Sequence, residues 1–171
     1  LNYGQTGSND GGFPGNSSGQ ACGFSGGCKA AGSAGGGLDL NTDVAGLSRW
    51  ADAVEREGCR LLGQVQDAGR GRHEPGRNAG AIGASALPDD ISWTMPHAMS
   101  KGEIRAFIDS AAESSARLAR WGYSGVEISA GHGHLFHQFM SPRSNRRDDD
   151  YGGCLENRTR FVSELCAAIR S

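Results

Sequence analysis

Three histidines lie within six residues of one another in the segment SAGHGHLFHQF, Ser129–Phe139. They are His132, His134 and His137, out of five histidines in the whole chain. Imidazole titrates near neutrality, so the cluster could exchange protons with a substrate or hydrogen-bond it. A metal site is an alternative, but the segment has neither a nearby cysteine nor a helical i,i+4 histidine pair. A third alternative is that a histidine caps the loop or fills space, and apolar neighbours favour this structural role for His137.

A second polar segment, GQVQDAGRGRHEPGRN, covers Gly63–Asn78. The amide of Gln64 follows apolar residues, and an amide there can donate to and accept from a heterocycle at once. Arg70, Arg72 and Arg77 stand among glycines and could bind a phosphate, although a glycine and arginine loop alone is a weak signal. For Gln64 taken alone, structural and functional interpretations are equally favoured.

The third polar segment, SPRSNRRDDDYGGCLENRTRF, covers Ser141–Phe161. Arg146 and Arg147 precede aspartates 148–150, so local ion pairs are expected there. Tyr151 and the two glycines after it form a turn into the next helix. Opposite charges this close together usually fix the shape of a loop, so we interpret this segment as structural.

Apolar periodicity predicts the elements that position these segments. Ser100 and Glu103 form a capping box at the start of the clearest helix. The predicted order is helix, strand, long loop, helix, strand, long loop, helix. These elements cover residues 44–58, 59–65, 67–99, 100–119, 124–129, 130–153 and 155–170.

This alternation is typical of parallel strands joined by helical crossovers, in an open doubly wound sheet or a (β/α) barrel. Two strands do not decide between the two architectures. Both place ligands at the carboxyl ends of the strands, where the two long polar loops begin. Function is therefore expected in these loops.

Composition narrows the function classes. The chain has 171 residues, a net charge of −2 and 28 glycines, of which 13 precede Leu38. Residues 1–37 are accordingly expected to be a flexible, glycine-rich segment. No apolar run approaches the length of a membrane span, and no basic stripe with aromatics indicates nucleic-acid binding, so neither a membrane nor a nucleic acid is expected as partner.

The number and spacing of the cysteines also indicate the cellular compartment. Five scattered cysteines fit a reducing, cytoplasmic environment better than a disulfide framework. Cys22 and Cys28 are the one close pair, and their separation is wider than that of a usual metal knuckle. We therefore expect no metal site.

Together, the segments resemble the flavin-dependent oxidoreductases of the Old Yellow Enzyme superfamily. The resemblance is carried by GQVQDAGRGRH (Gly63–His73), WGYSGVEISAGHGHLFHQFMSPRSNRRDDDYGG (Trp121–Gly153) and LENRTRF (Leu155–Phe161). It covers about residues 38–170 and is strongest to the branch with trimethylamine dehydrogenase, 2,4-dienoyl-CoA reductase and the N-methyl amino-acid demethylases.

The resemblance implies a (β/α)8 barrel with FMN at the carboxyl ends of its strands. Gln64 matches the family glutamine that hydrogen-bonds the flavin pyrimidine ring. His132 matches the second member of the pair that anchors the substrate, and Ser129 stands at the first, where the family commonly has histidine or tyrosine. His134 stands where ene-reductases often carry a tyrosine proton donor. These departures favour the amine-oxidising branch.

A whole barrel needs about 250 residues, so the resemblance implies a partial barrel, roughly strands three and four with flanking helices in residues 38–171. The cysteines that bind 4Fe-4S in this branch have no counterpart in the sequence, so a 4Fe-4S cluster could be present only in the full-length parent. The implied partners are a small-molecule substrate and NAD(P)H or an electron-transfer protein, and the complete protein could form a homo-oligomer.

Three hypotheses follow. The first is a fragment of an FMN-dependent enzyme that demethylates or dehydrogenates an N-methylated amine or amino acid. The second is an ene-reductase of the 2,4-dienoyl-CoA reductase type. The third is a truncated gene product without activity of its own, because open sheet edges would leave apolar surface uncovered.

Overall fold

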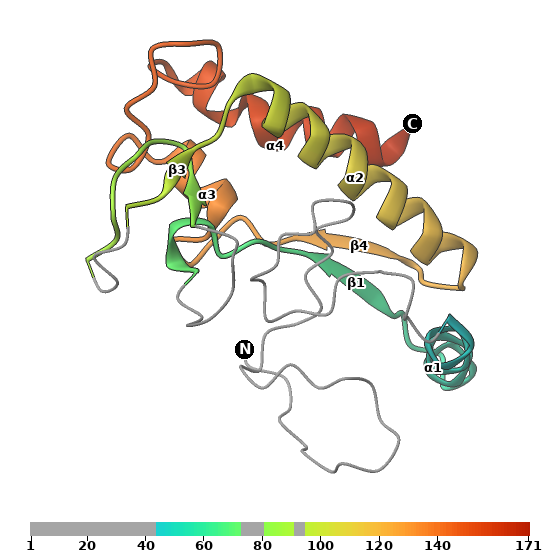
Figure 1. Cartoon of the computed structure of the whole chain (residues 1–171). Helices are drawn as coiled ribbons and strands as arrows, with labels where there is room; N and C mark the ends of the chain where they lie inside the picture. Colours follow the sequence, from blue (N-terminus) through green and yellow to red (C-terminus); the bar gives the residue numbers. More distant parts are fainter. Residues whose placement is uncertain (1–43, 73–80, 91–94) are drawn as a thin grey trace.

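Two short parallel strands, β1 (Leu62–Val65) and β4 (Gly125–Ile128), form the sheet from which both polar loops emerge. Gln64 pairs with Glu127 in the register, and Val65 pairs with Ile128. A computed structural model describes residues 44–72, 81–90 and 95–171 (Figure 1). The expectations for residues 1–37, including Cys22 and Cys28, lie outside this range. Within it, the parallel pairing predicted from the alternation of elements is confirmed, and both strands fall inside their predicted ranges.

Three long helices accompany the strands: α1 (Val44–Arg56), α2 (Lys101–Arg120) and α4 (Leu155–Arg170). Figure 1 shows α2 and α4 lying side by side along the same side of the sheet. In α1, Leu47 and Ala51 are buried and form a small cluster with Leu118 and Tyr123. All three helices were predicted, and each begins within one residue of the expected position.

The main core lies between the sheet and the helices α2 and α4. Its centre is an aromatic cluster in which Phe161 of α4 packs edge to face on Phe107 of α2, with 5.6 Å between ring centroids. Two further phenylalanines, Phe136 and Phe139, pack on Phe161 at 5.2 and 4.8 Å. Edge-to-face contacts of this kind add to the stabilisation that burial of the rings already gives. The predicted apolar stripe of α2 faces this core from Ile104 to Ala111, whereas Leu118 packs in the small cluster with α1 and Ala119 is exposed.

The two faces of the sheet differ because side chains alternate along a strand. Val65, Val126 and Ile128 belong to the helix-covered core. Gln64 and Glu127 therefore point to the opposite face, and Ser129 continues that face beyond the end of β4. The sheet thus presents polar side chains away from α2 and α4.

Both long loops contain structure that the sequence does not predict. The first holds the 3-10 turn η1 (Gly69–Gly71) and a two-residue parallel pair, β2 (Ile82–Gly83) with β3 (His97–Ala98). The second holds the short helix α3 (Leu135–Met140). The prediction of irregular chain throughout both loops was therefore wrong. These elements escape a periodicity analysis because they are short, and no side chain hydrogen-bonds the first turn of α3 as a cap.

The capping box at the start of α2 is present as predicted. The backbone N–H of Glu103 donates to Ser100 Oγ at 3.2 Å, and the backbone N–H of Ser100 donates to the Glu103 carboxylate at 2.7 Å. That second bond, helped by His97, lowers the pKa of Glu103 to about 2. Because the folded-state pKa is lowered, the stabilisation is present above the ordinary value of 4.5 and is lost as the pH falls toward 2.

Replacing Ser100 with alanine should lower the free energy of unfolding by about 1 kcal/mol, because the first turn loses its cap. Urea unfolding at neutral pH measures the change. Ser110→Ala in the middle of α2 is the control, since alanine is the better helix former there and no cap is lost. Equal effects of the two substitutions would contradict the capping role.

No helix in the three described ranges is both long enough and apolar enough to cross a lipid bilayer.

Candidate functional site

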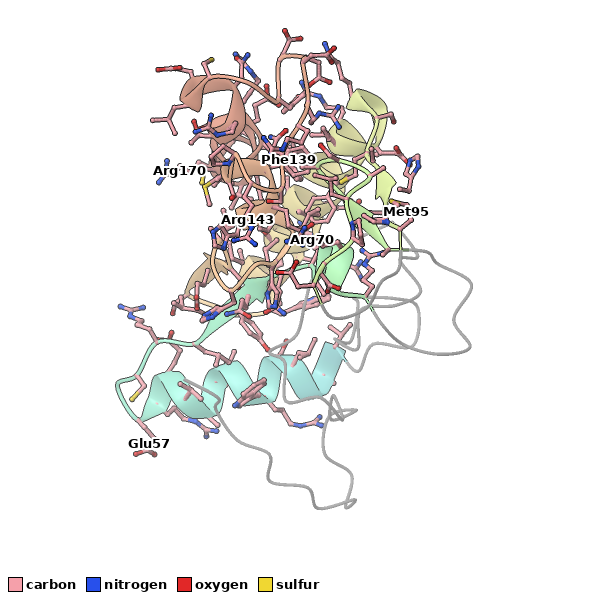
Figure 2. The ribbon with its side chains drawn as sticks, turned by 90° about the vertical axis from the view of Figure 1, so that its left-hand side faces the viewer. Glu57, Arg70, Met95, Phe139, Arg143 and Arg170 are labelled. Atoms are coloured by element: carbon pink, nitrogen blue, oxygen red, sulfur yellow. The ribbon has the colours of Figure 1, made fainter. Side chains whose placement is uncertain are left out.

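The polar loops that follow β1 and β4 meet at the carboxyl end of the sheet. The Ser129 N–H donates to the Val65 carbonyl at 3.0 Å, which extends the strand pairing by one step. Further along, the Leu135 N–H donates to the Asp67 carbonyl at 2.9 Å. In Figure 2, Arg70 of η1 and Phe139 of α3 accordingly lie in the same central part of the molecule. The structure thus brings the loop of Gln64 and the loop of the histidines together.

His132 lies in a turn with an unusual backbone. Its φ is 57°, and it is the single non-glycine residue with positive φ among the residues described. Gly133 follows with φ 74°. Histidine adopts this left-handed conformation more readily than most residues, but such positions are uncommon and often belong to functional turns. The turn leaves the His132 side chain exposed.

His134 lies beside His132 in a different environment. The two ring centroids are 6.2 Å apart, but His134 is half-buried, and its Nδ1 is buried with no hydrogen-bond partner in the described part of the chain. Burial lowers the pKa of His134 below its ordinary value, and the nearby rings of His132 and His137 lower it further against the opposing charge of Asp67. His134 is therefore neutral at physiological pH, with one ring nitrogen unpaired.

His137 has a structural contact, as the sequence analysis favoured. Its Nδ1 accepts a hydrogen bond from the Gly133 N–H at 3.0 Å, which closes the turn against α3. Its surroundings are not apolar, however, because the side chain lies on the exposed side of α3. The neighbours of His137 in sequence are buried, but His137 itself faces outward on the helix, which is why its apolar sequence context does not become an apolar environment.

The other two predicted site residues lie at the strand ends. Gln64 is half-buried on the face of β1 that points away from the helices. Ser129 is 8% exposed and follows β4 on the same face. Both therefore lie where the histidine loop begins, although no hydrogen bond joins their side chains to the imidazole rings among the described residues.

A buried ion pair beneath the site was not predicted. The side chains of Asp67 and Arg72 are 0% and 4% exposed and form a two-pronged contact, with Arg72 Nε donating to Asp67 Oδ1 at 3.1 Å. Asp67 Oδ1 also accepts from the Gly69 N–H at 2.7 Å. The phosphate-binding interpretation of Arg72 is therefore wrong, and Arg70 donates to the Pro88 carbonyl at 3.0 Å. Arg77 lies outside the described residues.

The ion pairs predicted for the third segment are confirmed in part. Arg147 binds Asp149 through two nitrogens, at 2.9 and 2.6 Å, and also donates to the carbonyls of Ala84 and Met99. Asp150 pairs instead with Lys101 of α2, at 2.5 Å. This network joins the ends of β2 and β3 to the loop after α3, which agrees with the structural interpretation.

The described ranges contain no group of three or more histidine, cysteine, aspartate or glutamate side chains arranged to hold a metal ion.

The environment of His134 predicts a pH effect on stability. The unfolded chain binds a proton at this ring more readily than the folded chain does, so the free energy of unfolding should fall as the pH drops below about 6.5. Urea unfolding between pH 7.5 and 5.5 measures the slope, and His134→Gln should flatten it. The exposed His97→Gln variant should retain it. An unchanged slope in His134→Gln would contradict this assignment.

Comparisons with known proteins agree with this architecture. The NADPH dehydrogenase of Clostridium acetobutylicum is 38% identical over 125 residues, which cover 73% of this chain and 36% of that protein. Morphinone reductase, solved in complex with tetrahydroNAD, superposes with a TM-score of 0.72 at 27% identity over 80% of this chain and 42% of the other. A 2-naphthoyl-CoA reductase in complex with 2-naphthoyl-CoA gives 0.73 at 30% identity, over 87% and 24%.

The chain therefore spans less than half the length of these relatives, and its strands and helices correspond to part of their barrels. The family model for the NADH:flavin oxidoreductase / NADH oxidase family matches residues 30–171. With this match over most of its length, and with parallel strands that carry polar loops at their carboxyl ends, the chain belongs to the NADH:flavin oxidoreductase / NADH oxidase family.

Proposed function

We propose that residues 38–171 are one part of an FMN-dependent barrel enzyme that takes electrons from NADH or NADPH and reduces a small molecule bearing an activated carbon–carbon double bond. The observation that carries the proposal is the pair His132 and His134 at the carboxyl end of β4, next to the strand end that holds Gln64. Two relatives are named reductases and a third an NADPH dehydrogenase, which supports this direction of electron flow.

The residues present fit a flavin ring. Gln64 offers an amide at the edge of the sheet, and an amide can pair with the alternating donors and acceptors of a pyrimidine ring. The Nδ1 of His134 has no hydrogen-bond partner among the residues described, which leaves hydrogen-bonding capacity in this loop for a bound group. When bound, FMN supplies the hydride chemistry, and the protein supplies position and electrostatics.

The two histidines would then act on the substrate. An unpaired buried N–H is less tolerable than an unpaired buried acceptor, so His134 should carry its proton on Nε2 and leave Nδ1 as the unprotonated nitrogen. Exposed His132 and the Nε2–H of His134 can both donate to a carbonyl oxygen. Such donors stabilise the negative charge that builds on the oxygen during reduction of a conjugated double bond.

Ser129 favours a second candidate, the oxidation of an N-methylated amine or amino acid. A serine at this buried position offers one small hydroxyl where the resembling reductases carry an imidazole or phenol. An amine substrate needs an acceptor for its N–H, and an unprotonated imidazole nitrogen of His132 could accept that proton as general base.

Anaerobic spectroscopy of the complete flavoprotein separates the two candidates. Reduction of the flavin by NADH or NADPH, followed by reoxidation by an α,β-unsaturated ketone, is expected for the first. Bleaching by an N-methyl amino acid without a nicotinamide would favour the second. A flavin that responds to none of these compounds would contradict both.

The 171-residue chain alone should bind no FMN, because it spans less than half of the relatives' barrels. Purification followed by absorbance at the flavin bands measures occupancy. A yellow, stoichiometric complex of the isolated chain would contradict the inference that further barrel segments complete the site.

A further inference from the structure

Gln138 of α3 lies beneath the histidine turn and is the least expected buried residue of the site. It is 2% exposed. Its side-chain Nε2 donates to the carbonyls of Ala68, at 3.1 Å, and Gly133, at 2.7 Å. Its Oε1 accepts from the backbone N–H of Arg70 at 3.2 Å. One amide thus joins the loop after β1 to the loop after β4 and uses both of its donors and an acceptor in doing so.

The Gln138 amide packs so closely against two glycines that neither position has room for a side chain unless the amide moves. A Cβ atom added to Gly69 would lie 2.5 Å from Gln138 Oε1, and one added to Gly83 would lie 3.3 Å from it. Gly69 also has a φ of +61°, which disfavours any other residue. The loop after β1, at Gly69, and strand β2, at Gly83, therefore approach Gln138 with bare backbone, so a small shift of Gln138 would displace both segments.

The turn that carries the two imidazoles depends on this anchor. The hydrogen bonds that hold the backbone between Gly131 and Leu135 include His134 N–H to Gly131 carbonyl, Gly133 N–H to His137, Leu135 N–H to Asp67 carbonyl, Gln138 N–H to His134 carbonyl, and the Gly133 carbonyl to the Gln138 side chain. Two of these contacts, that of the Leu135 N–H and that of the Gln138 amide, also tie the turn to the loop after β1, and Gln138 is the one side chain among them that does so. Two residues with positive φ, His132 and Gly133, make the turn unusually dependent on such external contacts.

We propose that Gln138 is a positioning residue, which fixes the orientation of His132 and His134 relative to the loop that follows Gln64. Its importance for turnover rests on the proposed function, but the positioning itself does not. Loss of the amide should let the 131–134 turn move outward and bring His134 into water.

Asn145 provides a matched control in the same region. It is also a buried amide, 5% exposed, whose Nδ2 donates to the carbonyls of Phe139 and Tyr151 and whose Oδ1 accepts from the Arg147 N–H. It therefore makes the same number of bonds to backbone as Gln138, with none to the histidine turn or to the loop after β1. Gln138→Met and Asn145→Leu each replace the amide with an apolar side chain of the same reach.

The test is an NMR titration of the histidine rings in the 171-residue chain, for which neither flavin nor substrate is needed. His132, His137 and Asp67 are the titratable groups facing His134, and all variants retain them. In Gln138→Met the titration midpoint of His134 should move upward, toward the ordinary value, because hydration of the ring removes the burial that lowers its pKa. In Asn145→Leu it should not move, although urea unfolding should show that both variants are destabilised. Equal midpoints in the two variants would overturn the proposal.

Gly69→Ala perturbs the same contact through the residue that faces the Gln138 amide. It can therefore test the proposal even if Gln138→Met fails to fold. Its added methyl group displaces the Gln138 amide, so the His134 midpoint should again rise. A destabilised Gly69→Ala chain with an unchanged midpoint would overturn the proposal. A shifted midpoint in a protein whose flavin reacts with no substrate would contradict the proposed function alone.

Discussion

Replacing Arg72 with methionine is expected to lower the free energy of unfolding by about 3 to 5 kcal/mol, one of the two largest effects that we predict. The substitution leaves Asp67, which is 0% exposed, as a buried carboxylate without its cation. A buried charge that has lost its partner is strongly destabilising, because it no longer has either water or a cation to stabilise it. The folded chain must bear this desolvation cost or open locally to hydrate the carboxylate. Urea unfolding at neutral pH measures the loss.

Two companion variants make the result specific. Arg60→Met removes an exposed ion pair with Glu55, in which the arginine side chain is 78% exposed, and should cost about 1 kcal/mol or less. The double variant Asp67→Leu with Arg72→Met should recover much of the loss, since no charge then remains buried. An effect of Arg72→Met no larger than that of Arg60→Met would show that the pair is solvated in solution.

The ion pair also illustrates why part of the site escapes a sequence analysis. Asp67 and Arg72 stand in a run of polar residues and glycines, a composition that indicates a solvated loop. Their burial depends on α3, whose Leu135 N–H binds the Asp67 carbonyl from nearly seventy residues further along the chain. A contact between distant segments leaves no local periodicity, so the arginine looked available for a phosphate.

The helices that could be predicted have local signals in the sequence, and the one that could not, α3, has none. α2 has a capping box and a repeated apolar stripe over twenty residues, and both signals depend only on neighbours in sequence. α3 has six residues and no side-chain cap. Such a short segment becomes helical because Phe136 and Phe139 pack on Phe161 of α4, a tertiary contact that outweighs the weak local preference.

The position of the candidate site was predictable for a different reason. Parallel strands joined by helices place their carboxyl ends at one edge, so Gln64 and the histidine loop had to approach each other once both strands were identified. The sequence could not distinguish the roles of the histidines. Exposure of His132, burial of His134 and the turn contact of His137 follow from backbone geometry that depends on Gly133 and Gln138.

The second large effect concerns catalysis by the complete flavoprotein. His132→Ala should lower kcat by about 100-fold or more, because the substrate oxygen loses a positioned hydrogen-bond donor. The FMN content should remain near that of the unchanged protein, since the exposed ring of His132 is assigned to the substrate. Gln64→Leu should instead loosen the flavin or shift its reduction potential, because it removes the amide assigned to the pyrimidine ring. Steady-state kinetics with a ketone substrate and flavin absorbance measure the two effects.

The backbone at His132 requires a control of its own. At a φ of 57° alanine is strained, so part of any loss in His132→Ala could come from a distorted turn. Asparagine tolerates this conformation and still carries an N–H donor, so His132→Asn should recover a substantial fraction of kcat. His132→Gly keeps the turn relaxed but supplies no donor, and it should remain as slow as the alanine variant. If glycine restored activity and asparagine did not, His132 would serve the turn through its backbone, and the substrate-binding role would pass to His134.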